Sequence, residues 1–253
     1  MTSVAGLSGR RVLVVGASSG IGRALAQQAG AAGARVAVAA RRLELVEEVA
    51  AAIRSSGGDA RAWRCDVTDP AACDALVDEA ASWLGGIDMV LYMSGRSPLV
   101  KVADASSELW HELLATNLVG AALVAGRALP HLRRAQRPVV VVTTHSMGTP
   151  WPWLGVYGST KAGLAELARG LRAEEPTVRV LCVAVGNTAT AFAQNWDPEL
   201  STEALELWIA QGMLRYEVLQ ADDMAARMLA AALDPGGPDD LLIAGADISG
   251  AGG

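Results

Sequence analysis

Cysteine is scarce in this sequence, with three in 253 residues and no CxxC spacing, so we expect neither a disulfide framework nor a metal site. No uninterrupted apolar run reaches the roughly 18 residues of a membrane-spanning helix, and the opening MTSVAGLSGRR lacks the apolar segment of a signal peptide. Basic residues are fewer than acidic ones, with 21 Lys and Arg and 27 Asp and Glu, which gives a formal net charge of -6. This balance argues against a nucleic-acid or anionic-membrane surface. We expect a soluble cytoplasmic protein.

Two kinds of segment alternate along the whole chain. Short β-branched runs are separated by longer segments rich in Ala, Leu, Glu and Arg, and 51% of all residues are apolar. Strands that are apolar throughout are buried on both faces, and their alternation with helices is typical of a parallel sheet. We therefore predict one α/β domain over residues 1–253, a doubly wound parallel sheet with helices on both faces. The predicted strands are 12–15, 35–38, 62–65, 87–92, 139–143 and 178–183, and the predicted helices include 22–32, 43–55 and 71–84.

A glycine-rich turn, GASSGIG at residues 16–22, follows the first predicted strand and precedes a helix. Glycine allows positive φ and lets backbone N–H groups approach a pyrophosphate, which the helix N-terminus then stabilises. The spacing is GxxxGxG instead of the GxGxxG of the standard dinucleotide fingerprint, and a tight connection without a ligand is the alternative. Its place in the first strand–helix unit favours a phosphate site. The candidate contacts are Gly16, Ser18, Ser19, Gly20, Ile21 and Gly22.

Two arginines, Arg41 and Arg42, directly follow the second predicted strand. A carboxylate at this point would bind the 2′-hydroxyl of NAD, whereas arginine favours the 2′-phosphate of NADP. We take Arg41 as the phosphate contact and Arg42 as the alternative, and at least one of the two only begins a solvated helix. After the third strand, Asp66 and Val67 lie where an adenine ring is contacted, unless Asp66 only caps its turn.

Tyr157 and Lys161 are four residues apart, which places a phenol and an ammonium on one face of a helix. The chain has only two lysines, Lys101 and Lys161, so a lysine at this spacing stands out. A compact ammonium lowers the pKa of a neighbouring phenol more locally than the wider guanidinium of arginine. A tyrosine whose pKa falls from about 10 toward neutrality can act as a general acid and base.

In combination, these residues resemble the short-chain dehydrogenase/reductase family over essentially the whole chain. Each motif is common alone, but their order and spacing are specific. The resemblance implies a three-layer Rossmann-type fold. The matching positions are the turn glycines Gly16, Gly20 and Gly22, the adenine motif Asp66 and Val67, the structural asparagine Asn117, and the YxxxK pair Tyr157 and Lys161.

The resemblance also implies a mechanism. Tyr157 would protonate the carbonyl oxygen in reduction, or remove the hydroxyl proton in oxidation. Lys161 would hold the nicotinamide ribose and lower the pKa of Tyr157, and Asn117 would position Lys161 through a water that relays protons. The cofactor supplies the hydride, so the chemistry needs no metal.

The third catalytic position of the family, a serine that polarises the carbonyl, is altered here. Counting 13 residues back from Tyr157 gives Thr144, and Ser146 lies two residues further on. Either hydroxyl can donate a hydrogen bond to an oxyanion, and we place Thr144 ahead of Ser146. His145 between them is a candidate substrate contact, although a lone histidine is more often packed or hydrogen-bonded.

Two further family positions keep only their glycine. The NAG motif after the fourth strand reads MSG and ends at Gly95, and the PG motif after the sixth strand reads VG and ends at Gly186. Both glycines remain candidate cofactor contacts. Thr188 and Thr190 can reach the nicotinamide carboxamide or a phosphate, and Thr190 fits the family position better.

Aromatic residues are few, and five of them fall in two loops. The first loop precedes Tyr157, and the second is the segment of about 188–215 that closes over substrate in the family. These rings would line a hydrophobic substrate pocket, or alternatively pack a lid or a subunit contact. The residues are Trp151 and Trp153 in the first loop and Phe192, Trp196 and Trp208 in the second.

We therefore predict an oxidoreductase that prefers NADP(H) and interconverts a hydrophobic ketone and a secondary alcohol. An NAD(H)-dependent alcohol dehydrogenase is one alternative. A dinucleotide-binding sensor or scaffold is another, against which the intact Tyr157, Lys161 and Asn117 argue. The helices over 113–129 and 162–171 are small and apolar on more than one face, and in the family such helices form a dimer face. We expect a homodimer or homotetramer.

Overall fold

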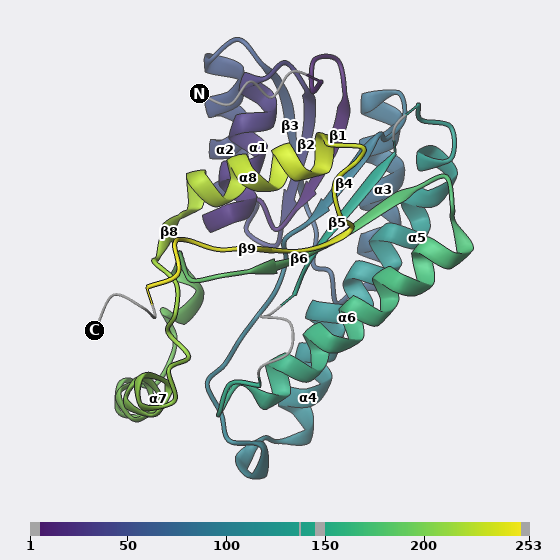
Figure 1. The fold of residues 1–253 in the computed structure, drawn as a ribbon. Helices are drawn as coiled ribbons and strands as arrows, with labels where there is room; N and C mark the ends of the chain where they lie inside the picture. Colours follow the sequence, from purple (N-terminus) through teal and green to yellow (C-terminus); the bar gives the residue numbers. More distant parts are fainter. Residues whose placement is uncertain (1–5, 137, 145–149, 249–253) are drawn as a thin grey trace.

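Seven parallel strands form the central sheet, in the order β3-β2-β1-β4-β5-β6-β9 (Figure 1). The structure is a computed structural model that describes residues 6–136, 138–144 and 150–248, with Thr144 described through its backbone. The strand order reverses between β1 and β4, and ligands of open α/β sheets bind at such a switch point. The predicted doubly wound, Rossmann-type sheet is confirmed. The strands are β1 (Arg11–Val15), β2 (Arg35–Ala40), β3 (Asp59–Arg64), β4 (Met89–Tyr92), β5 (Val139–Thr144), β6 (Arg179–Val185) and β9 (Asp240–Ile243).

The strands are apolar throughout because both faces of the sheet are covered. All four residues of 12–15 in β1 are fully buried, and Val14 pairs with Val38 of β2 and Leu91 of β4. Fully burying a side chain of this size contributes ~1.5–3 kcal/mol. The central strands therefore make a rigid platform whose carboxyl ends hold the loops described below.

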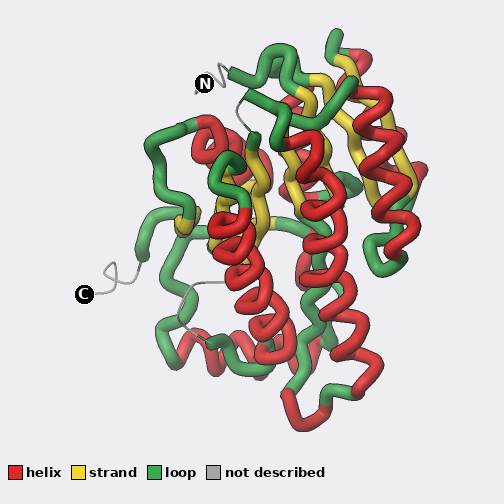
Figure 2. Tube along the Cα trace, turned by 90° about the vertical axis from the view of Figure 1, so that its right-hand side faces the viewer, coloured by secondary structure: helices red, strands yellow, loops and turns green. Residues whose placement is uncertain are grey.

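Helices cover the sheet on both sides (Figures 1 and 2). On one side α1 lies between α2 and α8, and side chains from all three join one buried apolar cluster with the sheet. On the other side α3 packs on α5, and α6 completes a second cluster. The bounds are α1 (Gly20–Ala31), α2 (Leu43–Ser55), α8 (Ala221–Leu233), α3 (Pro70–Leu84), α5 (Gly120–Leu132) and α6 (Gly155–Glu174).

One helical run, Ser107–Leu132, is long and apolar enough to cross a membrane by composition alone. It consists of α4 (Ser107–Leu114), a π-helical turn (Ala115–Val119) and α5. Core helices of soluble proteins pass the same test, and 44% of its most apolar window is buried within the molecule. Its α5 part packs on α3 and the sheet, so the run is a structural helix of the fold.

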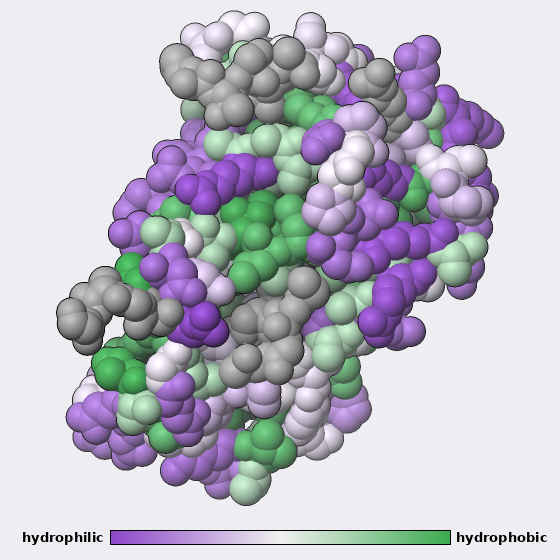
Figure 3. Space-filling view, viewed as in Figure 1, coloured by the Kyte–Doolittle hydropathy of each residue, from purple (hydrophilic) through white to green (hydrophobic). Residues whose placement is uncertain are grey.

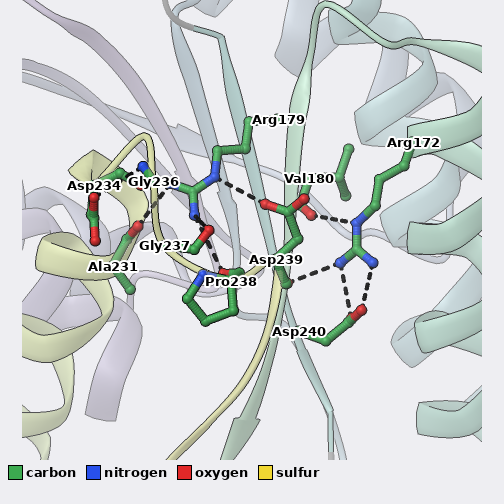
Figure 4. Close-up of polar contacts among 10 residues, drawn as sticks. All are labelled: Arg172, Arg179, Val180, Ala231, Asp234, Gly236, Gly237, Pro238, Asp239 and Asp240. Atoms are coloured by element: carbon green, nitrogen blue, oxygen red, sulfur yellow. Dashed lines mark hydrogen bonds and ion pairs between the residues drawn. The ribbon is translucent and has the colours of Figure 1, made fainter.

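The sequence did not predict β9, the edge strand beside β6. It has only four residues and begins with an acid, Asp240. Two arginines tie it to the sheet (Figure 4). Arg179 at the start of β6 bonds the Asp239 carboxylate and backbone carbonyls of α8 and of the loop that follows it. Arg172 of α6 forms two bonds with the Asp240 carboxylate, at 2.7 and 2.9 Å.

Two other segments depart from the sequence prediction or extend it. Strand β3 begins at Asp59, three residues earlier than expected, because its edge position leaves alternate side chains exposed and removes the apolar signal. The segment expected to close over substrate contains β7 (Thr188–Ala189) and α7 (Pro198–Ala210), and β7 pairs with β8 (Leu219–Gln220) in a separate small sheet. Helix α7 stands apart from the central sheet in Figure 1.

Candidate active site

The turn after β1 brings backbone, not side chains, to the end of the sheet. Gly16 has a φ of +88°, and a Cβ there would lie 2.5 Å from the amide nitrogen of Ser94. A Cβ on Gly22 would overlap the carbonyl oxygen of Gly16. Glycine is therefore required at both positions. A tight backbone turn leading into α1 fits the pyrophosphate cradle that the sequence predicts.

Residues after β6 approach the same turn from the other side. A Cβ on Gly20 would lie 3.3 Å from Cγ2 of Thr190, whereas Thr188 donates its hydroxyl to the Gly186 carbonyl at 2.9 Å. Of the two candidate threonines, Thr190 is thus the one in contact with the turn. Ile21 faces away from it and packs, partly buried, on the apolar core.

Arg42 is directed at the glycine turn. Its Nη2 lies 3.3 Å from the hydroxyl oxygen of Ser18, and Arg42 also forms the N-cap of α2. Arg41, the residue that sequence reasoning favours for the phosphate, has an exposed position one residue earlier. The hydrogen bond to the turn therefore belongs to the alternative candidate, and Arg41 shares with Arg42 only its position directly after β2.

Asp66 holds its own turn after β3. Its Oδ1 accepts hydrogen bonds from the amide of Thr68 at 3.0 Å and from the Thr68 hydroxyl at 2.8 Å. The pKa of this carboxyl is lowered, chiefly by the bond from the Thr68 amide and further by the charge of Arg41. Val67 is buried under α5, where a Cβ on Gly120 would collide with it. The capping role of Asp66 is thus observed, and an adenine contact remains a prediction.

Tyr157 and Lys161 both lie in the first two turns of α6 and face the end of the sheet, as their spacing predicts. Tyr157 is 7% exposed and Lys161 is 4% exposed. The Lys161 ammonium lies 5.7 Å from the centre of the Tyr157 ring, and Nζ donates a hydrogen bond to the Thr143 carbonyl of β5 at 3.1 Å. A buried ammonium is thereby held against a buried phenol.

Asn117 joins three parts of the site. It is completely buried in the π-helical turn, where its side chain exchanges two hydrogen bonds with the Arg96 backbone, at 2.8 and 2.9 Å. Its Nδ2 also donates to the Thr160 hydroxyl at 3.0 Å. A Cβ on Gly95 would lie 3.4 Å from Asn117 Oδ1 and 3.6 Å from Lys161 Nζ. Asn117 therefore fixes the loop after β4 beside the lysine.

Burial shifts the pKa values of the two titratable groups in opposite directions. Desolvation raises the pKa of the Tyr157 phenol and lowers the pKa of Lys161 to about 8. Both shifts favour the neutral form, as expected in a medium of low dielectric constant. The expected lowering of the Tyr157 pKa by Lys161 is not found in this structure, where desolvation raises the pKa of the phenol.

The catalytic hydroxyl is open to the same two candidates as before. Strand β5 ends at Thr144, the residue that the gapless count from Tyr157 reaches. The Thr144 backbone pairs with Ala184 of β6. The Thr144 side chain, His145 and Ser146 lie outside the described residues.

Four of the five aromatic residues expected at the substrate side form a continuous series of ring contacts with Tyr157. Phe192 lies 5.5 Å from the Tyr157 ring, Trp196 lies 5.9 Å from Phe192, and Trp208 lies 6.0 Å from Trp196. Trp151 closes the series at 5.0 Å from Trp208, and all four contacts are edge-to-face. Edge-to-face aromatic pairs add ~0.5–1.5 kcal/mol each beyond their buried area.

Trp153, the fifth ring, belongs to the rim of this cluster. It has a φ of +65°, in the left-handed region that bulky residues rarely adopt, and its carbonyl accepts a hydrogen bond from the Val100 amide at 2.9 Å. The Lys101 ammonium lies 5.1 Å from its ring centre. The loops before α4 and before α6 are joined here.

Sequence reasoning missed part of this cluster. Leu99 and Leu154 are buried in it together with Tyr157, and Ser97 is buried next to Trp196, whose indole N–H donates to the Ser97 carbonyl. Their place in the sequence could have pointed to them, because Ser97 and Leu99 follow within four residues of the MSG motif at the end of β4.

Comparison with known proteins identifies relatives of this arrangement. A family model described as short chain dehydrogenase matches residues 10–201. A fatty acyl-CoA reductase of Mycobacterium tuberculosis is 36% identical over 173 residues, which are 66% of this chain and 58% of that protein. The 3beta-hydroxysteroid dehydrogenase 1 of Eggerthella lenta is 32% identical over 200 residues, which are 76% of this chain and 77% of that protein.

Solved structures share the fold along nearly the whole chain. A short chain dehydrogenase from Burkholderia cenocepacia, in complex with NADP, has a TM-score of 0.81 and 26% identity. The match covers 94% of this chain and 97% of that one. The match to the mycobacterial reductase, by contrast, spans less than two thirds of that protein's length.

Proposed function

The chain belongs to the short-chain dehydrogenase/reductase family, whose members are oxidoreductases that use NAD(P) on a CH–OH or C=O group, and we propose a finer function within it. We propose that the protein is an NADP(H)-preferring reductase of hydrophobic ketones. The observation that carries the proposal is the Tyr157 phenol, buried beside the Lys161 ammonium at the head of a series of aromatic rings. The reaction is ketone plus NADPH plus a proton giving secondary alcohol plus NADP⁺.

The backbone of the glycine turn fits the diphosphate. Arg41 and Arg42 fit the 2′-phosphate, because both directly follow β2 and the Arg42 guanidinium lies beside that turn. The Burkholderia cenocepacia relative was solved in complex with NADP, which supports NADP as a cofactor of this chain. When bound, the reduced dinucleotide supplies a hydride to the carbonyl carbon.

Tyr157 supplies the proton. As the carbonyl oxygen gains negative charge, the phenol O–H bond breaks and the proton bonds to that oxygen, leaving a phenolate. Lys161 stabilises this phenolate through its positive charge, and Asn117 keeps the neighbouring loop in place. Since burial raises the pKa of Tyr157, the phenol is protonated at neutral pH, which is the form that reduction needs.

The substrate is apolar and bulky. Phe192, Trp196 and Trp208 extend from Tyr157 as a wall of rings with few charged groups among them. Two relatives carry names, fatty acyl-CoA reductase and 3beta-hydroxysteroid dehydrogenase, that refer to large hydrocarbon substrates. These names support a hydrophobic ketone or its alcohol as the substrate class.

Calorimetric titration with NADPH and, separately, with NADH tests the cofactor preference. A charge-assisted hydrogen bond contributes ~1.5–3 kcal/mol, so we expect NADPH to bind about 10- to 100-fold more tightly. Arg41→Ala and Arg42→Ala, compared side by side, should identify the phosphate contact as the variant that weakens NADPH and leaves NADH unchanged. Tighter binding of NADH would favour the NAD-dependent alternative, and binding of neither would contradict the enzyme proposal.

A further inference from the structure

The Ser97 hydroxyl is a buried polar group that has no hydrogen-bond partner within the part of the chain that the structure describes. The residue is 7% exposed. Buried hydroxyl groups in folded proteins almost always have a partner, because an unpaired one costs free energy. Alanine would fill nearly the same space without that cost. The hydroxyl therefore points to a partner that is not part of the described chain.

The backbone around Ser97 is held on both sides. The preceding residue, Arg96, exchanges two backbone hydrogen bonds with the Asn117 side chain, at 2.8 and 2.9 Å. The carbonyl of Ser97 itself accepts the indole N–H of Trp196, which reaches it from 99 residues further along the chain. The backbone that carries the hydroxyl is thus held in place before any ligand binds, which favours a specific contact.

Ser97 also belongs to a segment that borders both residues of the proposed catalytic pair. Two residues before it, Gly95 borders the Lys161 ammonium, since a Cβ there would be 3.6 Å from Nζ. Two residues after it, Leu99 is buried in the same apolar cluster as Tyr157 and Trp208. The segment that carries Ser97 therefore runs from the surroundings of the lysine to the apolar cluster around the phenol.

We propose that the Ser97 hydroxyl hydrogen-bonds a second oxygen of the substrate, separate from the carbonyl that Tyr157 protonates. This rests on the proposed function and narrows its substrate class to hydrophobic ketones that carry a further hydroxyl or carbonyl oxygen. A serine hydroxyl donates and accepts, so it suits either group. A few placed polar groups in an apolar pocket fix the orientation of the ligand, and Ser97 is a specificity-determining residue of this kind.

The test compares wild type and Ser97→Ala on a matched pair of ketones with NADPH. The pair is 1-phenyl-1,2-propanedione, which has the second oxygen, and propiophenone, which lacks it. Dividing the kcat/KM of the variant by that of wild type removes the difference in intrinsic reactivity between the ketones. We expect the kcat/KM of Ser97→Ala to fall about tenfold on the dione, which is the effect of losing one hydrogen bond. On propiophenone the kcat/KM should change less than twofold.

Three further readouts exclude other roles for the hydroxyl. Ser55→Ala, which removes an exposed hydroxyl of α2, should leave both ketones unchanged. The Tm of Ser97→Ala should equal or exceed that of wild type, because no bond within the described chain is lost, and a lower Tm would overturn the proposal by giving the hydroxyl a role in the fold. Weaker NADPH binding by Ser97→Ala would assign it to the cofactor and also overturn the proposal.

The kinetic outcomes separate this inference from the proposed function. Suppose that wild type reduces both ketones. If Ser97→Ala then lowers kcat/KM equally for the two ketones, or for neither, the inference is wrong and the proposed reductase function is retained. If wild type reduces neither ketone, the proposed function fails and the inference fails with it.

Discussion

At the scale of single residues, the site is governed by desolvation. Burial raises the pKa of Tyr157 and lowers the pKa of Lys161 to about 8, so each side chain is shifted toward its neutral form. A neutral phenol is a proton donor, and a lysine that titrates near pH 8 is sensitive to conditions close to neutrality. Both properties lead to measurable predictions.

Tyr157→Phe should remove the proton donor while keeping the ring and its contact with Phe192. General acid catalysis contributes about 10²–10⁴-fold, so we expect kcat for ketone reduction to fall by at least 100-fold, with NADPH affinity unchanged within twofold. Steady-state kinetics and calorimetry measure the two quantities. Tyr216→Phe, the same change in a tyrosine outside the catalytic helix, is the control. Retained turnover in the Tyr157 variant would remove the acid role.

Lys161→Met should change the pH dependence of stability. The pKa of Lys161 is about 8 in the folded chain and about 10.4 in an unfolded one, so between these values the unfolded state binds more protons. The cost of burying the charged lysine is complete below pH 8 and disappears as pH rises toward 10.4. The stability of wild type relative to Lys161→Met should therefore rise by ~3 kcal/mol across this range.

Urea unfolding at several pH values measures this difference. Lys101→Met, which removes the exposed second lysine, is the matched control. Curves for wild type and Lys161→Met that run parallel from pH 7 to 10 would show that Lys161 is not shifted by burial.

At the scale of elements, edge strand β9 depends on side-chain anchors more than on its own apolar content. Arg179 in β6 bonds the Asp239 carboxylate at 3.0 Å and the carbonyls of Ala231 and Gly237 at 2.9 and 3.1 Å, which joins α8, its following loop and β9 (Figure 4). Since strand β9 is only four residues long, these bonds set its register against β6.

Arg179→Ala should therefore destabilise the fold. Losing several bonds and leaving an acid and carbonyls unpaired costs ~2–3 kcal/mol, which corresponds to a Tm lower by roughly 4–10 °C for a chain of this size. Thermal unfolding followed by circular dichroism measures it. Arg169→Ala, which breaks an exposed pair with Glu166, should cost less than ~0.5 kcal/mol. Equal Tm values for the two variants would refute the anchoring role.

Elements buried on both faces could be predicted from the sequence, because burial leaves a continuous apolar run. Strand β1 is an example, with residues 12–15 fully buried. The placement of Tyr157 and Lys161 on one helix could also be predicted, since a spacing of four residues is a local property. Strand β9 could not be predicted, because its first residue is acidic and its edge position leaves it without a continuous buried apolar run. The partnership of Ser97 with Trp196 could not either, because 99 residues separate them and only the fold brings them together.

At the scale of the whole molecule, apolar surface remains outside the core. Val119 in the long helical run Ser107–Leu132 is 46% exposed, with Leu114 exposed nearby. Figure 3 shows further apolar surface in the middle of one face. Leu242 of β9 is also exposed. We propose that the chain forms a homodimer or homotetramer that covers the helical face.

Val119→Arg should weaken that assembly, because it places a charge in an interface that would be apolar. Light scattering after size exclusion should report an oligomer for wild type and a shift of most of the protein to monomer for Val119→Arg. Leu205→Arg on α7, where the leucine is equally exposed at 45%, should keep the wild-type mass. A monomeric wild type would contradict the expected assembly.

The central claim is that this chain transfers a hydride from NADPH to a hydrophobic ketone while Tyr157 supplies the proton. The most direct measurement is mass spectrometry of the alcohol formed from NADPH deuterated at C4 of the nicotinamide, with each of the two C4 isotopomers in turn. We expect one deuterium on the carbinol carbon from one isotopomer and none from the other. Alcohol without deuterium from both isotopomers, or no alcohol with any ketone of the hydrophobic class, would contradict it.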